Sequence, residues 1–164
     1  MAHYRMIQVS EKPLTKDDIE DFEIHEGDLT YFFPDYWGDE DRGDALECLQ
    51  EIFGGSILKH TKKYIVIDRE ELGIMLMREF EAWRTAVCNM SFEDATDVES
   101  YKAMRPTRYL SVGHAIYEDG WNGCGEHTWD YLTNMYHYRF KEKKTGKEKK
   151  TFRLYYGASI DFHV

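Results

Sequence analysis

The sequence predicts an α+β fold, because two kinds of hydrophobic periodicity occur along the chain. Apolar residues recur at helical spacing in its middle, and they alternate with polar residues in its last third. Tyrosine is abundant, with 12 residues, which suits sheets that bury one side of each ring and leave the hydroxyl in water. We therefore expect a single domain, residues 1–164, in which an antiparallel sheet carries helices.

The first part of the chain is expected to alternate short strands and helices. Thr15 is a suitable N-cap for a short helix. Apolar Ala45, Leu49 and Ile52 fall at helical spacing, which predicts a second, longer helix. In order, the predicted elements are a strand at 3–10, a helix at 14–22, an extended aromatic stretch at 28–37, a helix at 39–55 and two strands within 56–68.

A long helix is predicted after residue 68, where Asp68 supplies an N-cap. Its apolar residues recur every three or four positions and predict one buried stripe, consisting of Leu72, Leu76, Phe80, Trp83 and Val87. We expect this helix to pack on one face of the sheet, with a weaker helix at 91–104 after it.

The last third is expected to form a C-terminal three-strand meander, with strands at 107–118, 127–140 and 151–164. Pairing Phe140 with Phe152 aligns the apolar faces of the last two strands. The same register pairs Lys144 with Glu148, and a slip by one residue would lose both matches. This alignment predicts a three-residue loop at 145–147.

Charge is unevenly distributed along the chain, whose formal net charge is −10 at pH 7. Residues 11–51 contain 15 acidic and 3 basic residues, whereas residues 139–153 contain 8 basic and 2 acidic ones. Such an asymmetry favours electrostatic association with a partner of opposite charge.

Cysteine usage and the N-terminal sequence both predict a cytoplasmic protein. The three cysteines, Cys48, Cys88 and Cys124, are odd in number and widely spaced, which argues for reduced thiols. The first residues show no apolar run typical of a secretion signal, and no apolar run is long enough to span a bilayer.

The stretch GWNGCGEHTW, residues 120–129, contains the residues most typical of chemistry. Cys124 and His127 have a spacing that zinc sites use, and His114 and His163 are the nearest candidates for further ligands. Because this supplies only half of a site from the loop itself, we expect no metal and no cofactor. The glycines and the Asn-Gly pair favour a tight connection between two strands.

A cysteine nucleophile is the alternative chemistry for this loop. Cys124, His127 and Asp130 contain the residue types of a catalytic triad. On the predicted strand, however, His127 and Asp130 would point to opposite faces. The spacing therefore argues against the triad.

His114 lies on the apolar face of its predicted strand. We interpret it as a hydrogen-bonded core histidine. The functional alternative is a general base with Tyr136 or Tyr156 as its polar neighbour.

The acidic segment DYWGDEDRGD does not match the calcium-binding EF-hand pattern. It combines carboxylates with aromatic side chains, a mixture that suits binding to a basic protein surface, including one that normally holds nucleic acid. The predicted partner-binding residues are Asp35, Tyr36, Trp37, Asp39, Glu40, Asp41 and Asp44.

The basic connection at 141–150 argues against direct nucleic-acid binding, because it has no aromatic residue for base stacking and contains alternating glutamates. No phosphate-binding loop, dinucleotide fingerprint or serine-hydrolase motif occurs in the chain. Small acidic domains of this kind recur among accessory proteins of phages and mobile elements, some of which block nucleic-acid-binding enzymes. The sequence therefore favours a non-enzymatic acidic inhibitor that occludes such a surface. The alternative is a small hydrolase or nuclease with its site at Cys124 and His127.

Overall fold

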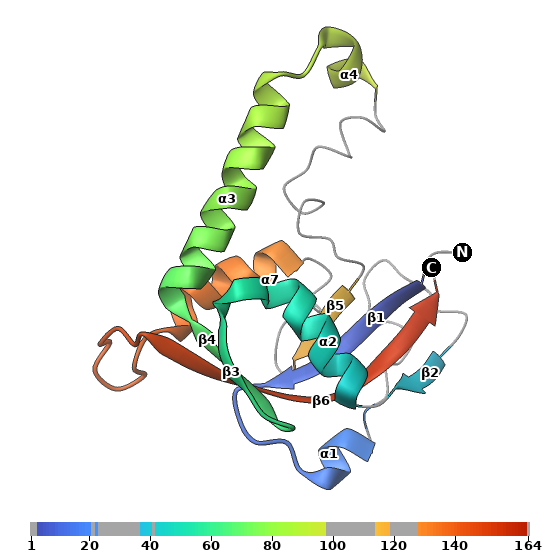
Figure 1. The fold of residues 1–164 in the computed structure, drawn as a ribbon, viewed down its shortest axis with the longest axis vertical. Helices are drawn as coiled ribbons and strands as arrows, with labels where there is room; N and C mark the ends of the chain where they lie inside the picture. Colours follow the sequence, from blue (N-terminus) through green and yellow to red (C-terminus); the bar gives the residue numbers. More distant parts are fainter. Residues whose placement is uncertain are drawn as a thin grey trace.

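A mixed sheet forms the centre of the molecule and confirms the predicted α+β class (Figure 1). The computed structural model describes residues 3–20, 22, 37–40, 42–97, 114–118 and 128–163. Within these residues the sheet has six strands in the order β3-β4-β6-β1-β5, and β2 also pairs with β6. The strands are β1 (His3–Ser10), β2 (Trp37–Glu40), β3 (Ile57–His60), β4 (Tyr64–Asp68), β5 (His114–Glu118) and β6 (Thr151–His163).

The helices occupy most of the positions that the apolar spacing predicts in the first two thirds of the chain. They are α1 (Lys16–Glu20), α2 (Arg42–Phe53), the short 3₁₀ turn η1 (Gly54–Ser56), α3 (Arg69–Cys88), α4 (Phe92–Thr96), α7 (Thr128–Asn134) and the π-helix η2 (Met135–Arg139). The expected cap of α1 is present, because Asp18 N donates to Thr15 Oγ1 at 3.1 Å.

β6 is the longest strand and organises the sheet. Its first half pairs with β4 and its second half with β2, while β1 runs antiparallel along its other edge. The register of β1 shifts between Ile7 and Val9, which marks a β-bulge. At this bulge Gly157 of β6 lies against the side chain of Gln8.

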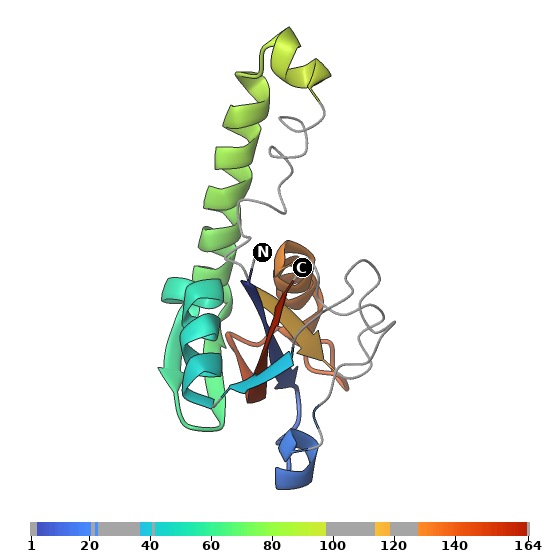
Figure 2. The ribbon, with the colours of Figure 1, turned by 90° about the vertical axis from the view of Figure 1, so that its right-hand side faces the viewer.

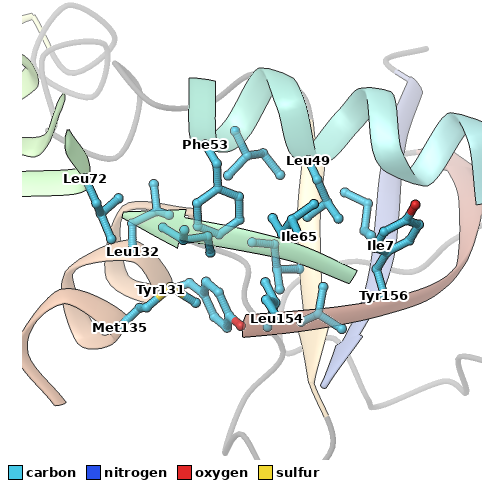
Figure 3. Packing of buried hydrophobic residues seen from close by; sticks show 14 of the residues in the cluster. Ile7, Leu49, Phe53, Ile65, Leu72, Tyr131, Leu132, Met135, Leu154 and Tyr156 are labelled. Carbon is cyan, nitrogen blue, oxygen red and sulfur yellow. The ribbon is translucent and has the colours of Figure 1, made fainter. Parts of the chain in front are cut away.

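The main hydrophobic core combines the sheet with α2, the start of α3 and α7 (Figure 3). Leu49 and Phe53 of α2, Ile7 and Leu154 of the sheet, and Leu72 of α3 are all fully buried. Each such side chain contributes roughly 1.5–3 kcal/mol through removal of apolar surface from water. The core thus fixes α2 across the strands.

The predicted meander is wrong, because residues 128–139 form a helix rather than its middle strand. α7 continues directly into η2, and its buried residues Tyr131, Leu132 and Met135 recur at helical spacing. The many aromatic residues of this segment favour a strand, but burial of the helical face decides the outcome. β5 pairs with β1 in parallel, so the sheet is mixed rather than antiparallel.

The predicted register between residues 140 and 152 is also wrong. Glu148 pairs with Lys141 in an isolated bridge, not with Lys144. Phe140 and Phe152 do contact, with ring centroids 5.9 Å apart, although Phe140 follows a helix and not a strand. The sequence thus predicted the contact but not the backbone that makes it.

The long helix α3 packs on the rest of the molecule only through its first turns. Leu72 and Leu76 are buried, whereas Phe80 and Val87 of the same predicted stripe are 38% and 39% exposed. The helix projects away from the sheet and carries α4 at its far end (Figures 1 and 2). The expectation that it lies on one face of the sheet is therefore wrong. None of the described helices is long and apolar enough to cross a bilayer.

Replacing Asp68 with alanine is expected to lower the free energy of unfolding by about 1 kcal/mol. The Asp68 carboxylate accepts a hydrogen bond from Glu71 N at 3.0 Å and so satisfies one of the free N–H groups at the start of α3. Urea denaturation would measure the loss. Asp68→Asn keeps an acceptor and should lose less, so equal losses in the two variants would contradict a capping role.

Candidate functional site

Part of the predicted acidic surface lies within the described residues. Trp37, Asp39 and Glu40 form most of β2, where Asp39 pairs with Ile160 of β6 and Glu40 with Ser159. Asp44 lies in the first turn of α2. Asp35, Tyr36 and Asp41 lie outside the described residues.

α2 presents further carboxylates along the side that faces water. Asp44, Glu47 and Glu51 follow one another at spacings of three and four, so their side chains share one stripe of the helix. Glu47 and Glu51 are exposed, while Ala45 and Leu49 on the other side are buried. No basic residue occupies the last turn of α2.

The two residues of the predicted loop chemistry, Cys124 and His127, lie outside the described residues. The predicted strand that would separate His127 from Asp130 is wrong, because Asp130 lies in helix α7. His163 pairs with His3 of β1, and not with Trp129 as the meander required. Cys48, which is buried, and Cys88, which is exposed, form no disulfide with a described residue.

His114 lies at the start of β5 and contacts a carboxylate of α2. Its Nε2 is 2.9 Å from Glu51 Oε2, and its imidazole is 12% exposed. Its backbone carbonyl accepts a hydrogen bond from Thr128 Oγ1 at 3.2 Å. Nδ1 is buried, and no described residue lies in hydrogen-bonding position to it. The contact with Glu51 ties β5 to α2, in agreement with a hydrogen-bonded histidine at the edge of the core.

A nearly buried ion pair joins Glu118 of β5 to Arg139 of η2. Arg139 Nη1 donates to Glu118 Oε1 at 2.8 Å and lies 2.6 Å from Oε2. Among the described residues, Oε2 has no hydrogen bond of suitable geometry. The guanidinium also covers the ring of Tyr131 at 5.0 Å, and Glu11 lies 3.8 Å away. Arg139 therefore joins η2 to β5.

Burial shifts the pKa values of this group. Removal from water raises the pKa of Glu118 above its ordinary value, although the Arg139 guanidinium partly offsets the effect. Burial and the Glu118 carboxylate raise the pKa of Tyr131 well above 10. Burial opposes the charge of Arg139, but Tyr131 and Glu118 outweigh it and leave the pKa of Arg139 raised. Arg139 thus stays charged and Tyr131 neutral over the physiological range.

The role of this ion pair is to hold elements together. Both side chains of the pair are at most 10% exposed, and the arginine's charge is directed at Glu118, Tyr131 and Glu11. Sequence reasoning missed the group, although a signal was present. Glu118 shares the parity of buried Ile116 on β5, and a carboxylate at a buried strand position requires a cation.

Among the described residues, no three histidine, cysteine, aspartate or glutamate side chains are placed to hold a metal ion. No known protein family matches the chain, and no curated protein or solved structure is significantly similar to it. Function is therefore inferred from the charges, contacts and grooves of this chain alone.

Proposed function

We propose that the protein is a non-enzymatic binding module that uses its predicted acidic surface, the carboxylates of β2 and α2, to occlude a basic surface of another protein. The observation that carries the proposal is the row of carboxylates at Asp44, Glu47 and Glu51 on a helix that the core holds firmly against the sheet. A rigid row of negative charges attracts a basic surface at long range and loses little entropy on binding.

The partner that fits this surface best is a nucleic-acid-binding protein. Such a protein presents lysine and arginine side chains in an array that matches phosphates, and spaced carboxylates on a helix offer the same charge. Bound there, the module would act as an inhibitor by competing with nucleic acid. That Cys48 and Cys88 form no disulfide with a described residue supports a reducing, cytoplasmic location for this activity.

The test is affinity capture from a cell lysate with the wild-type protein and two charge-matched variants. Asp39→Lys/Asp44→Lys/Glu47→Lys reverses the acidic surface. Glu70→Lys/Glu79→Lys/Glu93→Lys makes the same change in net charge on α3 and α4, away from that surface. Capture at about 50 mM and about 500 mM salt separates electrostatic from apolar binding.

We expect the wild type and the α3/α4 variant to retain the same basic protein at low salt and to release it at high salt. The acidic-surface variant should not retain it, and duplex DNA should displace the wild type from the captured protein. The proposal would be contradicted if the acidic-surface variant retained the basic protein, or if duplex DNA failed to displace both the wild type and the α3/α4 variant from it. Circular dichroism of each variant would establish that it is folded.

A further inference from the structure

A basic groove lies between η2, the connection at 141–150 and the start of β6. Its volume is about 560 Å³, within the range of ligand-binding sites. Six cationic side chains line it, namely Arg139, Lys141, Lys143, Lys144, Lys149 and Arg153, against the two carboxylates of Glu11 and Glu142. The groove therefore carries a net positive charge on a protein whose total charge is −10.

The two carboxylates of the groove have partners within the protein. Glu11 accepts from Lys143 Nζ at 2.8 Å and lies near Arg139. Glu142 accepts from Thr145 Oγ1 at 2.6 Å. The remaining glutamate of the connection, Glu148, lies 3.5 Å from Arg69 of α3, in a neighbouring groove. Among the described residues, therefore, neither Glu142 nor Glu148 forms an ion pair with Lys141, Lys144 or Lys149.

Three lysines of the groove keep their charge available to a ligand. Lys141, Lys144 and Lys149 are exposed and form no ion pair with a described residue. A phosphate backbone is the polyanion that such separate, exposed ammonium groups contact most readily, and its binding releases counterions.

The backbone that carries these lysines is preorganised. Gly146 N donates to Glu142 O and Glu142 N to Lys147 O, each at 2.8 Å, and Gly146 has φ +68°, which favours glycine. Lys149 N donates to Phe140 O at 2.7 Å, and Arg69 N donates to Lys150 O at 2.9 Å. A fixed turn reduces the entropy lost when a ligand binds.

An aromatic side chain lies beside these lysines as a consequence of the π-helix. Tyr138 lines the groove and is 69% exposed. The sequence argued against nucleic acid because the connection itself lacks an aromatic residue. The fold supplies this ring from η2, and an exposed ring next to cations is the combination that binds single strands by stacking and charge.

We propose that this groove binds single-stranded nucleic acid, with Lys141, Lys144 and Lys149 contacting phosphates and Tyr138 stacking on a base. An acidic polypeptide would use the same cations, but it would gain little from an exposed tyrosine ring. The proposal concerns a different surface from the acidic one and does not depend on the function proposed above.

The experiment measures fluorescence anisotropy of a labelled oligothymidylate at several salt concentrations. Lys141→Gln/Lys144→Gln/Lys149→Gln is compared with Lys12→Gln/Lys59→Gln/Lys63→Gln, which removes the same charge elsewhere. The slope of log K against log salt is negative, and the groove variant should reduce its magnitude by about 2, because each phosphate contact on a single strand contributes roughly 0.7. The control variant should leave that slope unchanged.

Tyr138→Ala should weaken binding roughly five-fold or more while leaving the salt slope unchanged, because stacking releases no counterions. Polyglutamate of matched charge should compete poorly with the oligonucleotide. The proposal would be overturned if the wild type did not bind the oligonucleotide at low salt, or if the two lysine variants lost affinity equally. It would also be overturned if Tyr138→Ala bound as tightly as the wild type, or if polyglutamate competed as strongly as the oligonucleotide.

Discussion

Replacing Arg139 with methionine is expected to lower the free energy of unfolding by about 3–5 kcal/mol. The variant leaves the carboxylate of Glu118 nearly buried without the guanidinium that lies 2.6–2.8 Å from it. It also removes the cation above the ring of Tyr131. Urea denaturation followed by circular dichroism would measure the loss.

The size of this loss should depend on pH. Burial already raises the pKa of Glu118 above its ordinary value of 4.5, so the folded state holds this proton at higher pH than the unfolded state does. The contribution of Glu118 to stability therefore decreases as pH rises from 4.5 through its raised pKa, and removal of Arg139 strengthens that trend. We expect a larger loss at about pH 8 than at about pH 5.

The double variant Glu118→Leu/Arg139→Met is the control for this prediction. It removes both charges, so it should recover most of the stability that Arg139→Met loses. A double variant as unstable as the single one would show that the unpaired Glu118 carboxylate is not the cause of the loss. A loss that does not change with pH would contradict the role of the Glu118 charge.

Replacing Gly157 with alanine is expected to lower the free energy of unfolding by about 2–5 kcal/mol, from overpacking and from broken hydrogen bonds. A Cβ at this position would lie 2.0 Å from Gln8 Oε1 and 3.1 Å from Leu14 Cδ1. Gln8 is only 8% exposed, its Nε2 donates to Asp18 O at 2.7 Å, and its Oε1 accepts from Ala158 N. The clash would therefore displace a side chain that connects β1, α1 and β6.

Two further variants make this prediction specific. Gly55→Ala adds the same methyl group where no atom lies within 4 Å, and thermal denaturation should show little change. Gln8→Ala/Gly157→Ala removes the clashing atom and should be more stable than Gly157→Ala alone. If the double variant is instead less stable, steric overlap with Gln8 is not the cause of the loss.

The elements with one dominant periodicity could be predicted from the sequence. Alternation in β6, and the capped helical spacing that follows Asp68, depend on local preferences and on the burial of one face. The acidic stripe of α2 likewise follows from helical spacing once Ala45 and Leu49 are buried. The spacing and the caps that predict these features lie within a few turns of the chain.

Tertiary contacts decided the conformation of residues 128–139. Its aromatic residues suit a strand, but a helix buries Tyr131, Leu132 and Met135 together and brings Arg139 to Glu118. The same helix brings Tyr138 beside the lysines of the basic groove. Helical spacing also could not show that only the first turns of α3 are buried. How much of the helix is covered depends on the size of the sheet and of the helices packed on it.

The sequence by itself determined the α+β class, the main capped helices, and the acidic and basic regions at 11–51 and 139–153, because spacing, caps and composition act locally. Only the tertiary structure decided the parallel pairing of β5 with β1, the ion pair of Glu118 with Arg139 and the form of the basic groove. Each of these joins residues far apart in the chain, and the burial of distant side chains against one another selects among local conformations of similar energy.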